Sequence, residues 1–338
     1  MKNLLCMAAL LMGLIFAFPL PMEAQDRLTI GYQLVYNPWK VAISEGAVEQ
    51  ATQASINWRQ FDSGAGVVNA MASGAVQVAM AGSSPIAAGL SRGLDLELVW
   101  IFEDIAAAEA LVVRNGTDIV APQDLVGKKI AVPVASTTHF HVLFALEQFG
   151  LSADQVEIVN LQPPGIIEAW NAGGIDAAFI WDPVLGEIKK SGKVLITSGL
   201  LSSWGKATFD GMVVDRSFAE DNAGFMCKLI KSISEADESY RSNPGAWGPE
   251  SGPAQAIAEL VGGEAANVPI VLDLYDFPTL DQQVSTQWLG GGGSGGAARA
   301  LRFTAEFLKA QGKVRSLPED FGRFVNPAYA EMVLNGAC

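Results

Sequence analysis

The sequence predicts an α/β protein built from two similar lobes, and three observations support this prediction. Short apolar runs rich in β-branched residues alternate with amphipathic runs from Leu28 onward, the pattern of parallel strands layered with helices. One strand-and-helix pattern occurs twice in this region, and the sequence becomes mostly helical after Asn222. The chain has 338 residues, of which 50% are hydrophobic, so it is long enough to bury two separate cores.

Nine segments have the composition of strands. In chain order they are LTIGYQ (28–33), INWRQFD (56–62), VQVAMAG (76–82), LELVWIF (96–102), EALVVR (109–114), KKIAVP (128–133), VEIVNL (156–161), IDAAFIW (175–181) and KVLITS (193–198). Amphipathic runs such as WKVAISEGAVEQAT (39–52) and GVVNAMASG (66–74) lie between them and predict helices. Near the C-terminus we expect helices in GFMCKLIKSISEADESYRSN (224–243), PAQAIAELVG (253–262) and AARALRFTAEFLKAQGK (297–313).

The repeated pattern consists of VVNAMASGAVQVAMAGSSP (67–85) and IIEAWNAGGIDAAFIWDP (166–183). Each copy has an apolar helix, a break containing glycine, a buried strand and a turn with proline. Glycine suits the end of a helix, and a strand that is apolar on both faces suits the centre of a sheet. The duplication therefore indicates two similar lobes and not one large sheet. A chance likeness between common strand–helix units is the alternative.

A glycine run, LGGGGSGG (289–296), has the composition of a flexible linker. It lies between two helical segments, and too little chain follows it to form another domain. We therefore predict a mobile surface loop.

The N-terminus has the features of a secretory signal peptide. Lys2 precedes the apolar run LLCMAALLMGLIFAFPL (4–20), and the segment PMEA ends on a small residue, which predicts cleavage near Ala24. The run could also span a bilayer, although the break at Pro19-Leu20-Pro21 favours removal. No later stretch is apolar enough for a membrane span. We expect an exported, periplasmic protein.

The charge and the cysteines limit the partners and leave one covalent question open. The formal net charge is −14, which argues against binding to nucleic acid and to anionic lipid.

Cys227 and Cys338 remain after signal cleavage. An oxidising compartment would allow them to form a disulfide, but one could equally be buried and the other lie at the chain end.

Two hydroxyl clusters stand where a strand gives way to a helix. Ser83 and Ser84 precede Pro85, and Ser136 precedes Thr137 and Thr138. A helix N-terminus has free N–H groups and a partial positive charge, which suit a tetrahedral anion. Ordinary helix capping is the alternative for each cluster alone. Because each lobe has one cluster, we expect a cleft in which both helix ends hold one anion.

Several catalytic classes lack their sequence signatures. No P-loop and no G-x-G-x-x-G motif follows a strand, so a nucleotide is not expected. A sulfonate fits the hydroxyls as well as a phosphate does. The only histidines, His139 and His141, diverge on a helix and do not predict a metal site. No nucleophile-elbow motif is present. We expect a binding protein with no cofactor, not an enzyme.

Three carboxylates lie near the same strand ends, at Glu109, Asp182 and Asp210. They can be solvated turn residues or helix caps. If the ligand also carries a cation, one buried carboxylate would face it, in a charge-assisted hydrogen bond of about 1.5–3 kcal/mol. Trp181 and Tyr32 could cover the methylene link between the two charged groups, although Trp181 could equally be a core residue.

Four segments, taken in order, resemble the periplasmic taurine-binding proteins of ABC importers. These are WRQFDSGAGVVNAMASGAVQVAMAGSSP (58–85), GKKIAVPVASTTHF (127–140), VEIVNLQPPGIIEAW (156–170) and FIWDPVLGEI (179–188). The resemblance extends over roughly residues 26–325, and STTH followed by NLQPP is its most specific part.

This resemblance implies a type II two-lobed periplasmic-binding-protein fold with two crossover strands and a helical C-terminal part. Lobe 1 would comprise residues 26–110 plus 206–338, and lobe 2 residues 111–205, after a signal peptide at 1–24. A monomer of this kind closes over its small-molecule ligand and delivers it to a membrane permease driven by an ATPase. The implied ligand is taurine. Another alkanesulfonate or a thiamine-precursor-like molecule is the alternative, and a secreted enzyme on this scaffold is a remote one.

The resemblance also implies the residues of the site. Around the sulfonate it places Ser83, Ser84, Thr137 and Thr138; as pocket lining or support it places Gln33, Trp181 and Glu109; at the ammonium it places Asp210. The sequence departs from the family pattern at Asp182, where a small apolar residue is usual, and at Gly211 and Met212, where bulkier residues are usual. These departures concern the ammonium end more than the sulfonate end.

Overall fold

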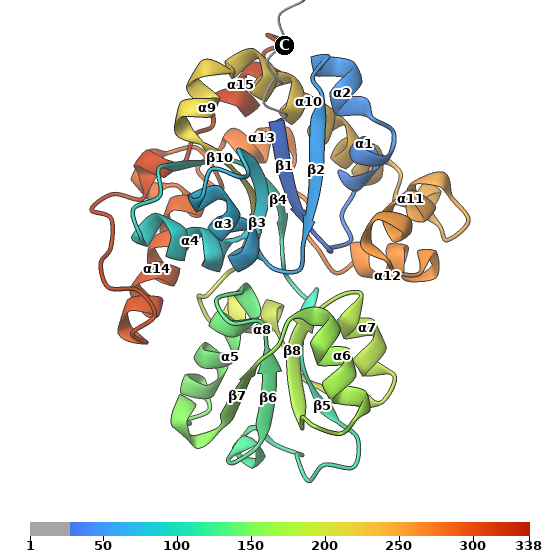
Figure 1. Cartoon of the computed structure of the whole chain (residues 1–338), viewed down its shortest axis with the longest axis vertical. Coiled ribbons are helices and arrows are strands. Elements are labelled where there is room, and N and C mark those ends of the chain that lie inside the picture. The colour runs from blue at the N-terminus through green and yellow to red at the C-terminus, as the bar shows by residue number, and fades with distance from the viewer. Residues whose placement is uncertain (1–27) are drawn as a thin grey trace, which may run out of the picture.

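The computed structural model describes residues 28–338 and shows two lobes, each built on a five-stranded sheet (Figure 1). The predicted signal peptide at 1–24 lies outside the described residues. None of the helices within 28–338 is long and apolar enough to cross a membrane.

The first sheet has the strand order β2-β1-β3-β10-β4. Its strands are β1 (Leu28–Gln33), β2 (Ile56–Phe61), β3 (Val78–Gly82), β4 (Leu96–Asp104) and β10 (Phe209–Asp215). β1 is parallel to β2 and β3, whereas β10 is antiparallel to both of its neighbours.

The second sheet has the equivalent order β7-β6-β8-β5-β9. Its strands are β5 (Glu109–Arg114), β6 (Lys129–Val132), β7 (Glu157–Asn160), β8 (Ala177–Trp181) and β9 (Gly192–Thr197). β6 is parallel to β7 and β8, and β5 is antiparallel to β8 and β9. All nine predicted strands are therefore present, and the prediction of parallel layering is wrong at the strands that pair with β5 and β10.

The two crossover strands are β5 and β10, as the fold prediction requires. The chain leaves the first sheet after β4 and returns to it at β10, which lies between β3 and β4. The predicted lobe boundary at 110/111 falls inside β5, because Glu109 already pairs with Trp181 of the second sheet. β10 was missing from the nine predicted strands because Asp210 and Gly211 interrupt its apolar pattern.

Helices cover both sheets (Figure 1). The helices of the first lobe that precede β4 are α1 (Lys40–Ser44), α2 (Ala47–Thr52), α3 (Gly64–Ala72) and α4 (Ser83–Ser91). The helices of the second lobe are α5 (Thr137–Gln148), α6 (Pro163–Asn171), α7 (Val184–Lys189) and α8 (Ser198–Ser203). The C-terminal helices, which return to the first lobe, are α9 (Arg216–Asp221), α10 (Ala223–Ser242), α11 (Gly252–Val261), α12 (Val268–Leu272), α13 (Leu280–Val284), α14 (Gly296–Ala310) and α15 (Ala328–Leu334).

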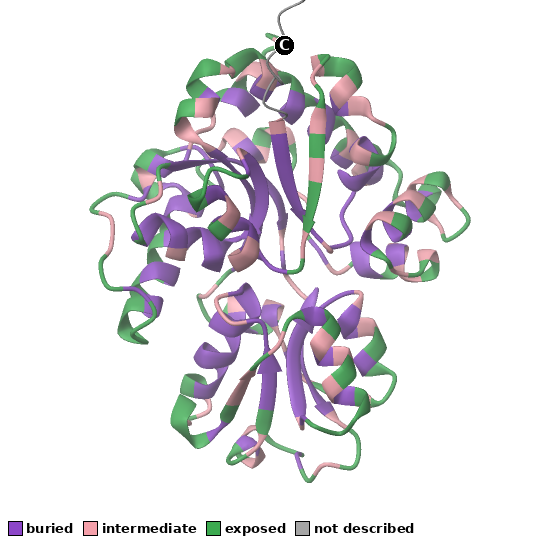
Figure 2. Cartoon of the chain, viewed as in Figure 1, coloured by how far each residue is buried: buried purple, intermediate pink, exposed green. Residues whose placement is uncertain are grey.

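The sheets form the buried centre of each lobe (Figure 2). Along β5, Leu111 and Val113 pack in one apolar cluster with α5, while Ala110 and Val112 belong to a second cluster on the opposite face. This second cluster continues into the core of the first lobe. The alternation follows from the two-residue period of a strand.

The duplicated sequence pattern occupies equivalent places in the two sheets. α3, β3 and α4 form the first copy, and α6, β8 and α7 form the second. Both β3 and β8 are third in their sheets, each between a parallel strand and a crossover strand. The prediction of two similar α/β lobes is confirmed.

The glycine run at 289–296 is packed more closely than a linker would be. Leu289 and Gly290 are buried, and Gly292–Ser294 form a short 3-10 helix, η5. A Cβ at Gly290 would collide with the carbonyl oxygen of Val284, and one at Gly296 with that of Gln287. Residues 291–294 are exposed, as a surface loop requires, and the mobility of the run stays a prediction. Gly290 and Gly296 are needed where one backbone segment packs directly on another.

The question of the cysteines has a structural answer. Cys227 on α10 and Cys338 form a disulfide with a Cα–Cα distance of 5.8 Å, which joins the chain end to the first lobe across 111 residues. A cross-link that closes so long a loop restricts the unfolded chain.

We expect the Cys227→Ser, Cys338→Ser double variant to lose about 2–4 kcal/mol of unfolding free energy. Urea titrations of both proteins, with and without reductant, check this. Reductant should lower the midpoint of the wild type and leave that of the variant unchanged.

Candidate ligand-binding site

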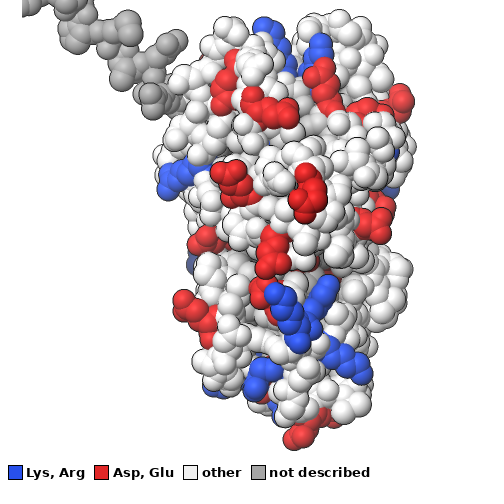
Figure 3. Space-filling view, turned by 90° about the vertical axis from the view of Figure 1, so that its right-hand side faces the viewer, with Lys and Arg blue, Asp and Glu red and all other residues white. Residues whose placement is uncertain are grey.

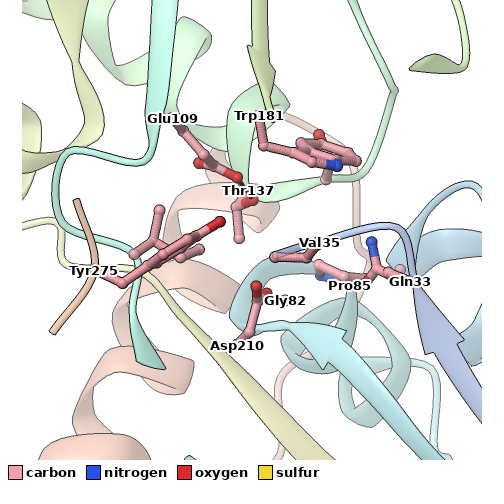
Figure 4. Close-up of a pocket in the computed structure, with 12 residues that line it drawn as sticks. Gln33, Val35, Gly82, Pro85, Glu109, Thr137, Trp181, Asp210 and Tyr275 are labelled. Atoms are coloured by element: carbon pink, nitrogen blue, oxygen red, sulfur yellow. Dashed lines mark hydrogen bonds between the residues drawn. The ribbon is translucent and has the colours of Figure 1, made fainter. Parts of the chain in front are cut away.

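A small pocket lies between the lobes (Figure 4). Both lobes contribute to its lining, which consists of Gln33, Val35, Gly64, Gly82, Pro85, Ile105, Glu109, Ser136, Thr137, Trp181, Asp210 and Tyr275.

Two helix N-termini from opposite lobes meet at this pocket. α4 begins directly after β3, with Gly82 as its N-cap, and α5 begins after Ser136, whose Oγ accepts a hydrogen bond from the N–H of His139 at 3.1 Å. A Cβ added to Gly82 would lie only 2.8 Å from Cγ2 of Thr137. The partial positive charges of both helix ends therefore act on the same small space.

The eight predicted site residues are all buried. Five of them line the pocket: Gln33, Glu109, Thr137, Trp181 and Asp210. The other three, Ser83, Ser84 and Thr138, are not among the residues that line it.

The hydroxyls of Ser83, Ser84 and Thr138 have different surroundings. Ser83 Oγ accepts a hydrogen bond from the N–H of Phe209 at 3.4 Å, and Thr138 Oγ1 lies 2.7 Å from Ser136 Oγ. Ser84 Oγ is buried and has no hydrogen-bond partner among the described residues. Sequence reasoning located both helix starts but could not tell which hydroxyls face the pocket, since a helix turns its neighbouring residues by about 100°.

Asp210 reaches the pocket from the crossover strand β10. It pairs with Gly82 across the sheet, so its carboxylate lies next to the start of α4. Burial raises the pKa of Asp210 and raises that of the adjacent Glu103 still further. Two buried carboxylates side by side favour a nearby positive charge.

One cation lies behind this pair. Lys40 is fully buried, donates to Oδ1 of Asn37 at 3.2 Å, and lies over the Trp39 ring at 4.2 Å. The amide of Asn37 in turn donates to Glu103 at 3.2 Å. Desolvation lowers the pKa of Lys40 to about 7, against the opposing effect of Glu103 and Asp210. Its charge acts on both carboxylates, and Asp210 is the one of the two that lines the pocket.

Glu109 enters from the second lobe on the other crossover strand, β5. Its Oε1 is 2.5 Å from Thr137 Oγ1, and its Oε2 is 3.1 Å from Ser198 Oγ. Burial raises the pKa of Glu109 to about 8, with a smaller contribution from Asp210. These contacts link the start of α5 to the start of α8.

The two histidines do not meet, as their spacing predicted. His139 Nδ1 accepts a hydrogen bond from the N–H of Ala135 at 3.2 Å, which stabilises the turn before α5. His141 lies 2.7 Å from Ser198 Oγ through Nδ1 and 2.8 Å from the Lys206 carbonyl through Nε2. Burial lowers the pKa of both imidazoles to about 4.

Tyr275, which follows α12, was missed by the sequence analysis. Its ring borders the pocket, and its hydroxyl points toward Glu109 and Thr137 (Figure 4). Burial raises the pKa of Tyr275, and the carboxylates around it act in the same direction. The segment VLDLYDF has no motif that marks this tyrosine, because the helical C-terminal part reaches the cleft only through its tertiary packing.

Asp182 does not line the pocket. Its Oδ1 accepts a hydrogen bond from the N–H of Gly186 at 2.9 Å in the first turn of α7, so the side chain stabilises that helix start. Its Oδ2 is buried without a hydrogen-bond partner among the described residues, and burial raises its pKa. The departure from the family pattern at this position therefore lies beside the site.

Known proteins share both the sequence and the fold. A family model described as NMT1/THI5 like matches residues 48–246. A taurine-binding periplasmic protein from Escherichia coli (strain K12) is 38% identical over 304 residues, which cover 90% of this chain and 92% of that protein. The chain belongs to the NMT1/THI5-like family. Within the family it is similar to binding proteins.

Solved structures show the same fold. The periplasmic aliphatic sulphonate binding protein SsuA from Escherichia coli superposes with a TM-score of 0.70 at 24% identity, covering 90% of this chain and 98% of that one. The desulfurization enzyme DSZB has a TM-score of 0.63 at 17% identity, covering 92% and 100%. The same fold thus occurs in a binding protein and in an enzyme.

Proposed function

We propose that this NMT1/THI5-like protein is the extracytoplasmic solute-binding component of an ABC importer and that it captures taurine between its two lobes. The observation that carries the proposal is the meeting of two helix N-termini, one from each lobe, at a small buried pocket that also holds Asp210 and Glu109. A zwitterion complements this pocket, because its strong-acid group suits the two helix N-termini and its ammonium group suits the carboxylate of Asp210. The 38% identical taurine-binding periplasmic protein supports the same ligand.

The sulfonate would lie between the starts of α4 and α5. Backbone N–H groups at a helix start donate hydrogen bonds to oxyanions, and a sulfonate needs donors without acceptors. Gln33 borders the same space from β1, and its side-chain amide can supply an N–H donor. Closing the cleft brings both helix ends onto one anion.

The ammonium would lie at Asp210. Asn37 joins Lys40 to Glu103, and Asp210 is the carboxylate of the pair that lines the pocket and can meet the ligand. Trp181 and Tyr275 border the pocket and would shield the methylene groups from water. A charged hydrogen bond in such a site contributes about 1.5–3 kcal/mol, enough to separate taurine from ethanesulfonate.

Capture and release would follow from hinge motion of the two lobes about the crossover segments. A ligand that contacts both lobes stabilises the closed state, and a membrane permease would recognise that state. On one face Asp and Glu spread over the first lobe, while Lys and Arg gather on the second (Figure 3). A permease that contacts both lobes would therefore need basic groups opposite the first and acidic groups opposite the second.

Taurine should raise the thermal unfolding midpoint by more than any other member of a panel of taurine, ethanesulfonate, sulfate, nitrate and thiamine-precursor pyrimidines. A ligand that binds only the native state stabilises it according to its concentration and affinity. Calorimetry should then give one site per monomer. A larger shift with a pyrimidine, or conversion of any ligand into a product, would contradict the proposal and favour the alternative binder or an enzyme.

A further inference from the structure

A chain of hydrogen bonds runs from the pocket into the core of the second lobe. It passes from Thr137 to Glu109, from Glu109 to Ser198, from Ser198 to His141 and from His141 to the carbonyl of Lys206, with distances of 2.5, 3.1, 2.7 and 2.8 Å. Glu109, Ser198 and His141 are at most 3% exposed. Water is thus largely excluded, so each donor and acceptor in the chain of hydrogen bonds must pair with another member of the chain.

The far end of the chain fixes the tautomer of His141. A carbonyl oxygen only accepts hydrogen bonds, so Nε2 of His141 must carry a proton and donate it to Lys206. In a neutral imidazole the other nitrogen, Nδ1, is then an acceptor. A doubly protonated imidazole is disfavoured because burial lowers the pKa of His141 to about 4.

The tautomer determines the direction of the remaining bonds. Ser198 has a single hydroxyl proton and must donate it to Nδ1 of His141, so it cannot donate to Glu109. An ionised Oε2 of Glu109 would then face only oxygen lone pairs at 3.1 Å. A proton on Oε2, donated to Ser198, satisfies both oxygens, and Thr137 donates to Oε1.

We propose that His141 is a positioning residue that holds Glu109 in its protonated form, so that the Glu109–Thr137 corner of the pocket offers oxygen lone pairs to the ligand but no charge. The functional consequence of this inference rests on the proposed function. A neutral Glu109 does not repel a sulfonate held at the start of α5, and the charged contact with the ammonium is made by Asp210.

The charged and titratable groups around Glu109 agree with this arrangement. Asp210 on β10 is a further carboxylate, Tyr275 is an uncharged phenol, and His141 on α5 acts through Ser198. None of these supplies a positive charge. The raised pKa of Glu109, about 8, has burial as its largest cause and Asp210 as a further one.

The first test is Glu109→Gln. The amide replaces the protonated carboxyl, since it can donate to Ser198 and accept from Thr137, and we expect taurine affinity at pH 7 to stay within about threefold of the wild type, less than 1 kcal/mol. A loss of tenfold or more would show that Glu109 acts as a carboxylate and would overturn the inference. Asp210→Asn serves as the contrast, because it should lose affinity.

The second test is the pH dependence of ethanesulfonate binding, a ligand with no titrating group of its own. Wild-type affinity should fall as pH rises through about 8, where Glu109 ionises, and Glu109→Gln should abolish this fall. In His141→Leu, Ser198 is free to donate to the carboxylate, so the midpoint should move down by about one pH unit.

Ser198→Ala should also move the midpoint down, because protonated Glu109 loses the oxygen that accepts its proton. His141→Gln, which can keep the donor toward Lys206 and the acceptor toward Ser198, should restore the wild-type midpoint, and His139→Gln should leave it unchanged. An upward shift of the midpoint in Ser198→Ala would overturn the inference, since it would mean that Ser198 donates to the carboxylate in the wild type.

An infrared measurement separates this inference from the proposed function. Ligand-free wild type at pH 7 should show a carboxylic-acid carbonyl band to which Glu103 and Asp237 also contribute, because burial raises the pKa of both. Glu109→Gln should remove one component of this band, and an unchanged band in the variant would overturn the assignment whichever ligand is bound. Failure of ethanesulfonate and taurine to bind wild type at any pH would instead contradict the proposed function while the band persists.

Discussion

Asp210→Asn should lower taurine affinity roughly 10- to 100-fold, because it removes one charged hydrogen bond of about 1.5–3 kcal/mol. Ethanesulfonate, which lacks the ammonium, should lose far less. Titration calorimetry with both ligands measures the difference. Asp273→Asn, which removes an equal charge from an exposed position, is the matched control and should affect neither ligand. Equal losses for taurine and ethanesulfonate in Asp210→Asn would contradict a role at the ammonium.

The same substitution should not destabilise the ligand-free protein at pH 7. Burial raises the pKa of Asp210 in the folded state, so the folded protein binds the proton more tightly than the unfolded chain does. The stability that this provides is present at low pH and is lost as pH rises through the folded-state pKa. The asparagine side chain of the variant carries no charge, so its unfolding free energy should match or exceed that of the wild type at neutral pH, and urea titration can measure this.

Gly82→Ala should abolish binding of every sulfonate while leaving the lobes folded. The φ of Gly82 is −67°, which alanine adopts readily. However, its Cβ would lie 2.8 Å from Thr137 Cγ2 and 3.2 Å from Asp210 Oδ1, so the lobes could not approach as closely. The variant should therefore remain open. Small-angle scattering should show compaction on adding taurine to wild type and none for the variant.

Gly224→Ala is the matched control for this experiment. Nothing lies within 4 Å of a Cβ at that position, which is at the start of α10 and away from the cleft. It should bind and compact like the wild type. Tight binding by Gly82→Ala would show that the interval between the two helix starts is not part of the closed site.

The strands and both helix starts could be predicted from sequence because they depend on local pattern. Runs such as VQVAMAG and IDAAFIW are apolar at every position but one, Gln77 and Asp176, as a strand in the centre of a sheet requires. β2 and β7 are only partly buried, so strands at the edges of the sheets also accept polar residues. The position of β10 could not be derived in this way, because a strand interrupted by Asp210 and Gly211 is recognised only once its two neighbours are known.

The site was predictable where it depends on strand ends and not where it depends on packing over long sequence separations. Glu109, Trp181 and Asp210 lie at or near the ends of strands, and the structure brings them to one pocket. Tyr275 reaches it from a segment without any motif. The partnership of Glu109 with Ser198 and His141 depends on the docking of α5 against α8, which has no local sequence signal.

The strand order has a consequence for the sequence of events in which the chain completes its fold. All strands of the second sheet lie between residues 109 and 197, so this half can close its sheet without any later segment. The first sheet begins earlier but lacks a strand between β3 and β4 until residues 209–215 have arrived. The half that starts the chain is therefore finished last, and until then two long apolar strand edges must be protected from neighbouring chains.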